Sequence, residues 1–427
     1  MARTKKEAAL TPEERLQAAL VSDWEWSYKL PENWCWTYFK SISTIQTGKK
    51  DANYGSDEGK YPFFTCAAEP IRCHGYSFDC RAILLAGNGD INNISRYNGK
   101  FEAYQRTYVV KIAEPLRFDY IFYWFKYRWF DFNKGKMFGT AIPYIRLGNL
   151  QEFPTPIPPL AEQQRIVDRI ESLFAKLDEA KEKAQAVVDS FETRKAAILH
   201  KAFTGELTAK WREEHGVSID NWKTTRFDSV AAIRSNLVDP AEYQSFPHIA
   251  PDNIEKKTGV LLEYHTIAED GVTSGKHRFY SGQILYSKIR PYLSKAVVVD
   301  FDGLCSADMY PIEAYQNARC LWYYMLSDEF LLQVATAGCR SGLPKINQKV
   351  LSALTVHVPT KDREQEEIAR ILDELFDKEQ QSKEAAEAGL DQIELMKKSI
   401  LARAFRGELG TNDPNEESAV ELLKQII

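Results

Sequence analysis

The sequence lacks the long apolar runs of a membrane protein, because no stretch reaches the about 18 consecutive apolar residues that a spanning helix needs. Its N-terminal residues contain no apolar signal core, so we expect a protein that is not secreted. Cysteine is scarce: seven among 427 residues, an odd number, which suits a reducing compartment better than a disulfide framework. We therefore expect a cytoplasmic protein.

Motifs for catalysis are missing as well. The chain has no Gly-rich cofactor loop after a strand, no Asn-Pro-Pro-aromatic tetrapeptide and no GxxxxGK[ST] phosphate loop. A metal site on Asp252 and Glu255 is disfavoured because only two residues separate the carboxylates. Cys66, Cys73 and Cys80 are spaced by seven, unlike the close pairs of structural zinc sites. We expect no catalytic residue, no metal site and no enzyme activity.

One long segment occurs twice. Residues 162–207 align without a gap with residues 364–409, and 20 of the 46 positions are identical. An ungapped self-match of this length indicates two copies of one unit. The repeat is the strongest signal in the sequence.

Both copies have the pattern of a long helix. In the first copy, apolar or small residues recur at alternating steps of four and three, with Arg194 as the one break, and Gly205 is a plausible stop. The second copy has Glu379, Ser382 and Gly389 in its middle, where small residues would let two backbones approach closely. We predict that the helices pair through Ile166, Ile170, Leu173, Phe174, Leu177, Phe191, Ile198, Phe203, Ile368, Leu372, Leu375, Phe376, Ile393, Ile400 and Phe405.

Globular sequence precedes each helix. Asn33-Trp34 recurs 188 residues later as Asn221-Trp222, and Ile157-Pro158 recurs as Val358-Pro359. We predict an α+β (mixed α/β) fold with two globular domains separated by two long helices, packed as an antiparallel coiled coil in a pseudo-two-fold tandem repeat. The expected segments are an N-terminal helical extension (1–30), domain 1 (31–159), helix 1 (160–208), a connector (209–220), domain 2 (221–359), helix 2 (360–410) and a tail helix (411–427).

Charge is unevenly distributed. The net charge of −5 argues at first against nucleic acid. Residues 31–159 nevertheless hold 16 Lys and Arg against 12 Asp and Glu, whereas residues 361–427 hold 10 against 17. The basic first domain is compatible with DNA binding.

The chain resembles the specificity subunit of type I restriction–modification systems over nearly its whole length. The matching motifs are Pro158–Gln164 (PPLAEQQ) and Phe203–Leu207 (FTGEL), which bracket the first helix, and Ile83–Asp90 (ILLAGNGD) and Gly282–Leu293 (GQILYSKIRPYL) in the two domains. The resemblance implies that each globular domain is a target recognition domain that reads half of a bipartite double-stranded DNA site. It also implies that the paired helices set the spacer and dock two methyltransferase subunits.

The same resemblance implies a division of labour. The partner methyltransferase would carry S-adenosylmethionine and methylate adenine, a restriction/translocase subunit would cut unmodified DNA, and this chain would bind no cofactor. A protein-binding coiled-coil scaffold without DNA specificity remains the alternative. Affinity that depends on DNA sequence, with partners present, distinguishes the two.

Base readout needs Arg, Lys, Asn, Gln or hydroxyl side chains on loops that enter a groove. Lys288 and Arg290 are two residues apart, so on a strand they would share one face. The candidates are Lys49, Lys50, Asn92, Asn93, Arg96, Tyr97, Lys100, Gln105, Arg106, Lys134 and Lys136 in the first domain, and Arg234, Asn236, Lys288, Arg290, Lys295, Arg340, Ser341 and Lys345 in the second.

Overall fold

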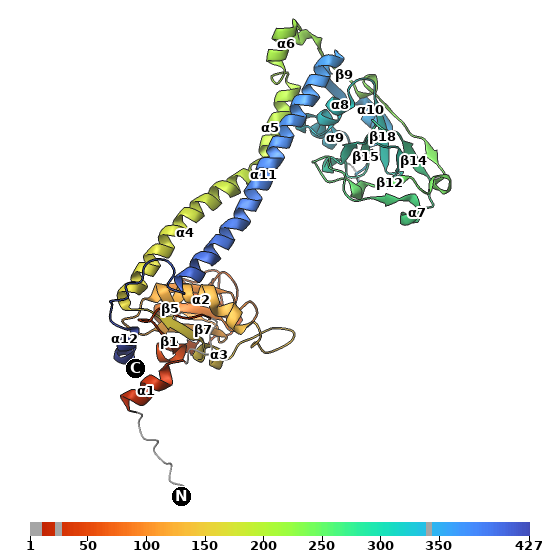
Figure 1. Cartoon of the computed structure of the whole chain (residues 1–427). Helices are drawn as coiled ribbons and strands as arrows, with labels where there is room; N and C mark the ends of the chain where they lie inside the picture. Colours follow the sequence, from red (N-terminus) through yellow and green to blue (C-terminus); the bar gives the residue numbers. More distant parts are fainter. Residues whose placement is uncertain (1–10, 22–27, 339–343) are drawn as a thin grey trace. The chain divides into compact units, whose positions relative to one another are not determined.

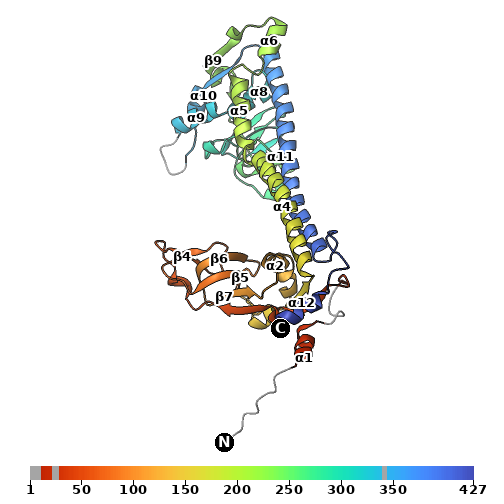
Figure 2. The same cartoon turned by 90° about the vertical axis from the view of Figure 1, so that its left-hand side faces the viewer.

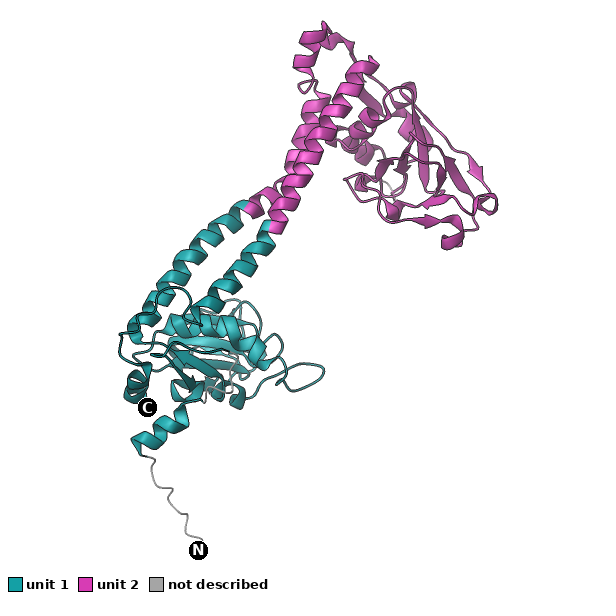
Figure 3. Ribbon diagram, viewed as in Figure 1, with its two compact units in different colours: residues 1–183, 389–427 teal, residues 184–388 magenta. Residues whose placement is uncertain are grey.

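The computed structural model describes residues 11–21, 28–338 and 344–427 (Figure 1). They form two compact units: unit 1 comprises residues 1–183 and 389–427, and unit 2 comprises residues 184–388 (Figure 3). Both long helices pass from one unit into the other. Each unit therefore contains one globular domain and parts of both repeats.

Unit 1 is built on a six-stranded sheet in the order β2-β7-β5-β6-β3-β4, in which only β3 and β6 are parallel. A separate antiparallel pair, β1 with β8, joins the two ends of the globular domain. The elements are α1 (Pro12–Ala19), β1 (Cys35–Tyr38), β2 (Ser43–Thr47), β3 (Tyr61–Phe64), β4 (Ile71–Cys73), β5 (Phe78–Ala86), β6 (Ile94–Ala103), β7 (Thr107–Ile112), α2 (Phe118–Asn133), α3 (Leu147–Gln151), β8 (Pro154–Ile157) and α12 (Ala419–Ile426).

The alternation of side chains along β5 separates two cores in unit 1. Ile83 and Leu85 belong to a large aromatic core that includes most of α2, whereas Ala82 and Leu84 belong to a smaller core. Figure 2 shows α2 beside the sheet, with β7, β5, β6 and β4 in a row. Helix α2 is rich in aromatic residues, and most of its residues are buried.

Unit 2 contains two sheets, one in the order β10-β18-β15-β16 and one in the order β11-β14-β17-β12-β13. Only β12 and β17 are parallel, and β9 pairs with β19. The elements are α5 (Phe191–Phe203), α6 (Ala209–His215), β9 (Trp222–Arg226), β10 (Ala231–Ile233), β11 (Leu237–Val238), β12 (Pro247–Ile249), β13 (His265–Thr266), α7 (Ile267–Asp270), β14 (Lys276–Phe279), β15 (Ile284–Ser287), β16 (Ala296–Val298), β17 (Gly303–Cys305), β18 (Met309–Ala314), α8 (Ala318–Met325), α9 (Asp328–Gly338), α10 (Gln348–Ala353) and β19 (Thr355–Pro359).

The two globular domains share one scaffold. The order β2-β7-β5-β6 in unit 1 and the order β10-β18-β15-β16 in unit 2 are the same relative to the sequence, and every neighbouring pair is antiparallel. The anchor after the first strand is shared too: Phe39 N–H donates to Phe153 O at 2.9 Å, and Phe227 N–H donates to Leu354 O at 2.8 Å. This confirms the tandem repeat, although the sequences between the frame motifs share little.

The second long helix is continuous and the first is not. Helix α11 (Asp362–Ala404) has 43 residues without a break. One residue, Ser190, separates helix α4 (Leu160–Asp189) from α5, which begins at Phe191. The helix predicted over residues 160–208 is therefore interrupted at Ser190 and ends at Phe203. The Ser190 hydroxyl donates back to Ala186 O at 2.5 Å, a bond that often bends a helix. Neither proline nor glycine is needed for this interruption.

Ion pairs define the antiparallel register of the helices. In unit 1, Lys181 Nζ lies 2.6 Å from Glu394 Oε1. In unit 2, Arg194 Nε lies 2.7 Å from Glu379 Oε2. The partner in α11 moves toward its N-terminus as α4 and α5 advance, which confirms the antiparallel coiled coil. The break in the first seam and the polar middle of the second therefore pair with each other.

The seam is tightly packed only near the globular domains. Ile166, Ile170, Ile368 and Leu372 have no exposed surface and belong to the domain cores, whereas the predicted seam residues between them are mostly half-buried. A Cβ added at Gly389 would meet nothing within 4 Å. The expectation that small residues bring the backbones into close approach was therefore wrong at this position.

Each helix ends in the domain of the other repeat. Phe405, at the end of the second repeat, is fully buried in unit 1, with its ring centroid 5.0 Å from that of Trp124. Its equivalent Phe203 is buried in unit 2, 5.1 Å from the ring of Tyr324. The two repeats thus complete each other's cores, which is the pseudo-two-fold relation expected from the sequence.

Buried glutamates secure both helix starts. Glu364 Oε1 accepts from Thr208 Oγ1 at 2.9 Å, from Arg212 Nη1 at 2.8 Å and from Trp222 Nε1 at 3.0 Å. At the equivalent position, Glu162 accepts from Thr411 Oγ1 at 2.6 Å. In each unit, the segment after one repeat is therefore tied to the helix start of the other. In the part of the chain that the structure describes, no helix is both long and apolar enough to cross a membrane.

Candidate nucleic-acid interface

Several loops of unit 1 meet where β5 ends and β7 begins. Gly87 N–H donates to Arg106 O at 2.8 Å, and Gln105 N–H donates to Lys50 O at 2.9 Å. A Cβ at Gly87 would lie 2.3 Å from Arg106 O, so only glycine permits this approach. Cys66 Sγ also approaches Arg106 O, at 3.6 Å. We call this group of loops the first loop cluster: residues 48–51, 65–67, 87–93 and 104–106.

Six predicted DNA contacts lie in the first loop cluster and divide into two classes. Three have side chains that hold the loops: Lys50 Nζ is 4.4 Å from the Tyr54 ring centroid, Asn93 Nδ2 donates to Cys66 O at 3.2 Å, and Gln105 Nε2 donates to Asp51 Oδ1 at 2.8 Å. The other three, Lys49, Asn92 and Arg106, are exposed; Gln105 is exposed too, but its side-chain amide is bonded to Asp51. Lys49 and Arg106 can therefore offer two cations, and Asn92 one amide, to a DNA strand.

Arg96 belongs to a different cluster, on the α2 side of the sheet. Arg96 and Arg81 both form ion pairs with Asp119, the latter at 2.6 Å. Their guanidinium groups lie over aromatic rings, Arg81 at 4.3 Å from the Phe118 ring centroid and Arg96 at 4.8 Å from that of Phe122. The two cations share one carboxylate, so the cluster keeps one net positive charge beside a cavity of about 290 Å³.

The remaining predicted residues of unit 1 are dispersed. Tyr97 faces the opposite side of β6 from Arg96 and packs on Phe64, with ring centroids 5.4 Å apart. Lys100 lies over the Tyr76 ring, and the Tyr76 hydroxyl raises the pKa of Lys100. Lys134 and Lys136 are exposed just after α2. The structure does not bring these four into the first loop cluster.

Unit 2 has a comparable group of loops at the matching end of its scaffold. Lys288 N–H donates to Asp308 O at 3.0 Å, and Arg290 N–H donates to Pro344 O at 2.9 Å. The Asp308 carboxylate lies 3.3 Å from Lys345 Nζ and 3.8 Å from Lys288 Nζ. We call residues 250–257, 287–295, 306–308 and 344–346 the second loop cluster.

The prediction that Lys288 and Arg290 share one face of a strand was wrong. Strand β15 ends at Ser287, and Arg290 has a φ of 45°, a left-handed backbone conformation that residues other than glycine rarely adopt. Pro291, whose own φ is fixed by its ring, then begins a short 3-10 helix over Pro291–Leu293. The turn leaves Arg290 exposed, whereas Lys288 is only partly exposed and lies against Asp308.

The other predicted residues of unit 2 differ in accessibility. Lys295 Nζ donates to Pro251 O at 2.7 Å and therefore holds the second loop cluster. Arg234 is exposed but paired with Glu313 at 2.7 Å, and Asn236 is exposed before β11. Arg340 and Ser341 lie outside the described residues.

Sequence reasoning missed the acidic residues that organise these cations. Asp119 is 38 residues from Arg81, and Asp308 is 37 residues from Lys345, so no local motif joins either pair. It also missed Arg278, whose guanidinium lies 4.8 Å from the Tyr280 ring centroid. Arg81 could have been found, because it lies two residues before the matched motif that begins at Ile83, and on a strand it would share a face with Ile83.

Two further titratable groups of unit 2, Asp270 and His277, have lowered pKa values. Asp270 Oδ2 lies 2.7 Å from His248 Nδ1, and this hydrogen bond lowers the pKa of Asp270. Burial, together with the charge of Lys288, lowers the pKa of His277. Among residues 11–21, 28–338 and 344–427, no three His, Cys, Asp or Glu side chains gather closely enough to hold a metal ion.

Comparisons with known proteins converge on one family. The family model described as "Type I restriction modification DNA specificity domain" matches residues 31–188 and 219–388. The chain belongs to this family. It is 39% identical to the type I restriction enzyme EcoDI specificity subunit of Escherichia coli, over 93% of this chain and 95% of the relative. The chain therefore carries two DNA specificity domains of a type I restriction–modification specificity subunit, a family described by DNA recognition and not by catalysis.

Solved structures support the same fold. The HsdS subunit from Thermoanaerobacter tengcongensis matches with a TM-score of 0.58 at 18% identity, over 90% of this chain and all of that one. A chain from a structure concerning complex assembly and conformational transition of the type I R-M system matches with a TM-score of 0.65 at 18% identity, with the same coverage. Each matched range of this specificity subunit contains one globular domain and much of the helix that follows it.

Proposed function

We propose that this specificity subunit reads a bipartite, asymmetric double-stranded DNA site, with one half contacted by each unit. One observation carries the proposal: the same four-stranded scaffold presents different side chains at the same end in the two units. Lys49, Asn92 and Arg106 are exposed in the first loop cluster, and Arg290 and Lys345 in the second. Different donors and acceptors select different bases, so the two half-sites differ.

The proposal extends to the complex. The paired helices set the spacer between the half-sites and dock two methyltransferase subunits, and restriction/translocase subunits join the same assembly. S-adenosylmethionine is bound by the methyltransferase, and this chain binds no cofactor. Support comes from α11, where Leu395 is 58% exposed and Met396 is 44% exposed, because neighbouring exposed apolar residues on a helix suit packing by further helices.

The test uses the specificity subunit assembled with its methyltransferase on cognate DNA. Arg290→Ala should weaken cognate binding by about 5- to 100-fold at fixed salt, the range for losing a base-reading arginine. Arg290→Gly is the matched control, because glycine accepts the left-handed backbone and also lacks the cation. Equal losses in both variants assign the effect to the guanidinium. Unchanged cognate affinity in either variant contradicts the role of Arg290.

A second readout locates the half-site. For Arg290→Ala, base changes in one half-site should lose their effect on affinity, while base changes in the other half-site keep theirs. Arg106→Ala should give the reverse pattern. If either variant reduced discrimination equally at both half-sites, the assignment of one unit to one half would be wrong.

A further inference from the structure

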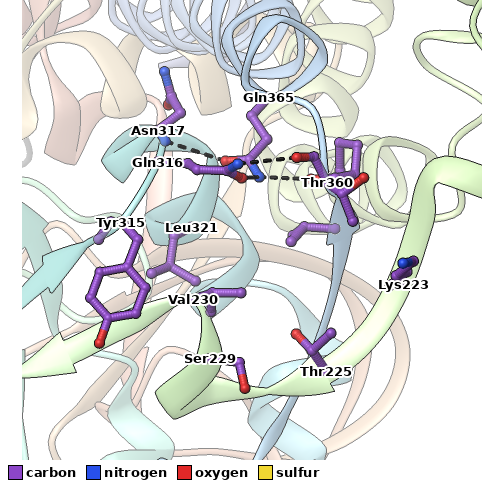
Figure 4. Close-up of a pocket in the computed structure, with 13 residues that line it drawn as sticks. Lys223, Thr225, Ser229, Val230, Tyr315, Gln316, Asn317, Leu321, Thr360 and Gln365 are labelled. Atoms are coloured by element: carbon purple, nitrogen blue, oxygen red, sulfur yellow. Dashed lines mark hydrogen bonds between the residues drawn. The ribbon is translucent and has the colours of Figure 1, made fainter.

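Alternate residues of β9, with the end of β19, line a cavity of about 350 Å³ on one face of this strand pair in unit 2 (Figure 4). In the described part of the chain, β9 pairs with β19 on one side and with no strand on the other. Val230 and Leu321 supply apolar surface in the middle of the cavity, and Tyr315 stands at its side, 59% exposed. An exposed sheet edge beside apolar surface is a site where another chain can add a strand.

The polar wall of this cavity is held in place by its own hydrogen bonds. Gln365 Nε2 donates to Gln316 Oε1 at 2.5 Å and to Pro359 O at 2.7 Å, and its Oε1 accepts from Asn317 N–H at 3.3 Å. Gln316 Nε2 in turn donates to Thr360 O at 3.0 Å. Figure 4 shows these bonds along one side of the cavity. The wall is therefore formed before any ligand arrives.

Unit 1 contains the same pair of strands in the same register. Cys35 of β1 lies opposite Ile157 of β8, and Lys223 of β9 lies opposite Val358 of β19. These are equivalent positions of the tandem repeat, so β1 and β9 align residue by residue. What covers β1 therefore indicates what β9 can accept.

In unit 1, the chain's own N-terminal segment covers this edge. Leu20 pairs antiparallel with Thr37, and Val21 N–H donates to Trp36 O at 3.1 Å. The Thr37 hydroxyl donates to Ala19 O at 2.9 Å. The segment Ala19–Val21 thus acts as a short added strand, and Thr37 has no exposed surface.

The equivalent threonine of unit 2 lacks this partner. Thr225 occupies the position of Thr37, and its Oγ1 is buried without any hydrogen bond. A buried hydroxyl without a partner is unfavourable, and a backbone carbonyl at the position of Ala19 O would satisfy it. Lys223, which replaces the buried Cys35, is exposed beside the same cavity.

We propose that unit 2 binds an extended segment of its methyltransferase partner along the outer edge of β9. The segment adds antiparallel to β9, as Ala19–Val21 adds to β1, and one of its carbonyls accepts from Thr225. It places an apolar residue opposite Thr225, as Leu20 lies opposite Thr37, and an acidic residue near Lys223. Its aliphatic side chains contact Val230 and Leu321. Main-chain pairing provides affinity in this binding mode, and the flanking pocket provides selectivity.

The choice of a partner follows from what the chain itself can supply. Residues 11–21 are already used in unit 1, and the connector before β9 is folded as α6 and the 3-10 turn at Ile219–Asn221. The proposal rests on the proposed function, because the methyltransferase is part of that proposal. A peptide-binding experiment tests whether the edge of β9 binds an extended segment, and an experiment on the assembled complex tests whether the methyltransferase supplies that segment.

The first arm tests the groove with a labelled synthetic peptide that copies residues 11–21, added to the full-length specificity subunit. Saturable binding by fluorescence anisotropy is expected, and Thr225→Val should weaken it about tenfold, the effect of losing one hydrogen bond of about 1.4 kcal/mol. The matched control is Thr224→Val, because Thr224 faces away from the cavity and bonds to His357. A peptide with Leu20→Asp should not bind, because Leu20 is the residue placed opposite Thr225 on the cavity face. No binding of the parent peptide, or equal effects of both threonine variants, overturns the groove.

The second arm tests the occupant by hydrogen exchange in the assembled complex. Adding the methyltransferase should protect the amides of β9, and Ser229→Trp, at an exposed position lining the cavity, should remove this protection and weaken assembly. Assembly at full affinity without protection of β9 overturns the proposal and leaves the proposed function intact. Dimerisation of the chain through β9 would assign the groove to a second copy and also overturn it. If no methyltransferase bound the specificity subunit, the proposed function would be refuted, and so would the claim that a methyltransferase segment occupies the edge of β9. The peptide experiment would still show whether that edge binds an extended segment.

Discussion

Phe405→Ala should destabilise unit 1, although Phe405 belongs to the second repeat. The ring is fully buried, with centroids 5.0 Å from Trp124, 5.3 Å from Tyr120 and 5.7 Å from Tyr127. Truncating a phenylalanine in such a core costs about 3–5 kcal/mol in the free energy of unfolding. For a unit of roughly 200 residues, this corresponds to a Tm lower by about 6–20 °C.

Hydrogen exchange with mass spectrometry can assign the loss to one unit. Peptides from β5 and β7 should exchange faster in Phe405→Ala, while peptides from β15 and β18 should keep their wild-type rates. Phe203→Ala is the matched variant, because Phe203 fills the equivalent place in unit 2, 5.1 Å from the Tyr324 ring. It should give the opposite pattern. Faster exchange in unit 2 alone for Phe405→Ala would refute the exchange of helix ends between the repeats.

Three further experiments test individual interactions. A double-mutant cycle on Arg194 and Glu379 should give a coupling of about 0.5–1 kcal/mol by urea unfolding, because both side chains are still partly exposed; no coupling would remove this pair from the register. Glu364→Ala should cost unit 2 about 3–5 kcal/mol because the charge of Arg212, whose side chain is only 11% exposed, loses its carboxylate partner. Glu364→Gln should cost less because its carbonyl still accepts; equal costs would contradict this explanation. Because the pKa of His277 is lowered in the folded state, unit 2 should be stabilised by neutral His277 above pH 6.5 and lose that stability as the pH falls below it. His277→Gln should flatten this acid dependence of the urea midpoint, and an unchanged slope between pH 7 and 5 would exclude His277 as its source.

The overall arrangement of the long helices and globular domains was predictable, because it depends on a sequence repeat and on the spacing of apolar residues. The duplicated helix, its antiparallel partner and the two globular domains follow from an ungapped repeat with a seam of apolar residues. The interruption at Ser190 was not predictable in this way, since it depends on one hydroxyl that bonds back to Ala186. The pairing of Arg194 with Glu379 could not be predicted without the register of the two helices, although Arg194 had been identified as the break in the first seam and Glu379 as a residue in the middle of the second copy.

The site was predictable in kind and not in detail. The sequence located basic and amide side chains on loops, but it could not show that Lys50, Asn93 and Gln105 hold those loops. That Asp119 neutralises part of the Arg81 and Arg96 pair depends on tertiary contacts between distant segments. The shared strand order of the two domains was also hidden, because strand pairing tolerates wide sequence change as long as inward and outward positions alternate.

The most direct test of whether the two units read two different half-sites is a map of adenine methylation across the genome of cells with and without this gene. Removing the gene should abolish one bipartite motif with two different half-sites, and the wild-type gene should restore it. Restoring the gene as Arg290→Ala should relax only one half of the motif. A palindromic motif, or an unchanged methylation map while the methyltransferase partner is expressed, would contradict the claim that the two units read two different half-sites.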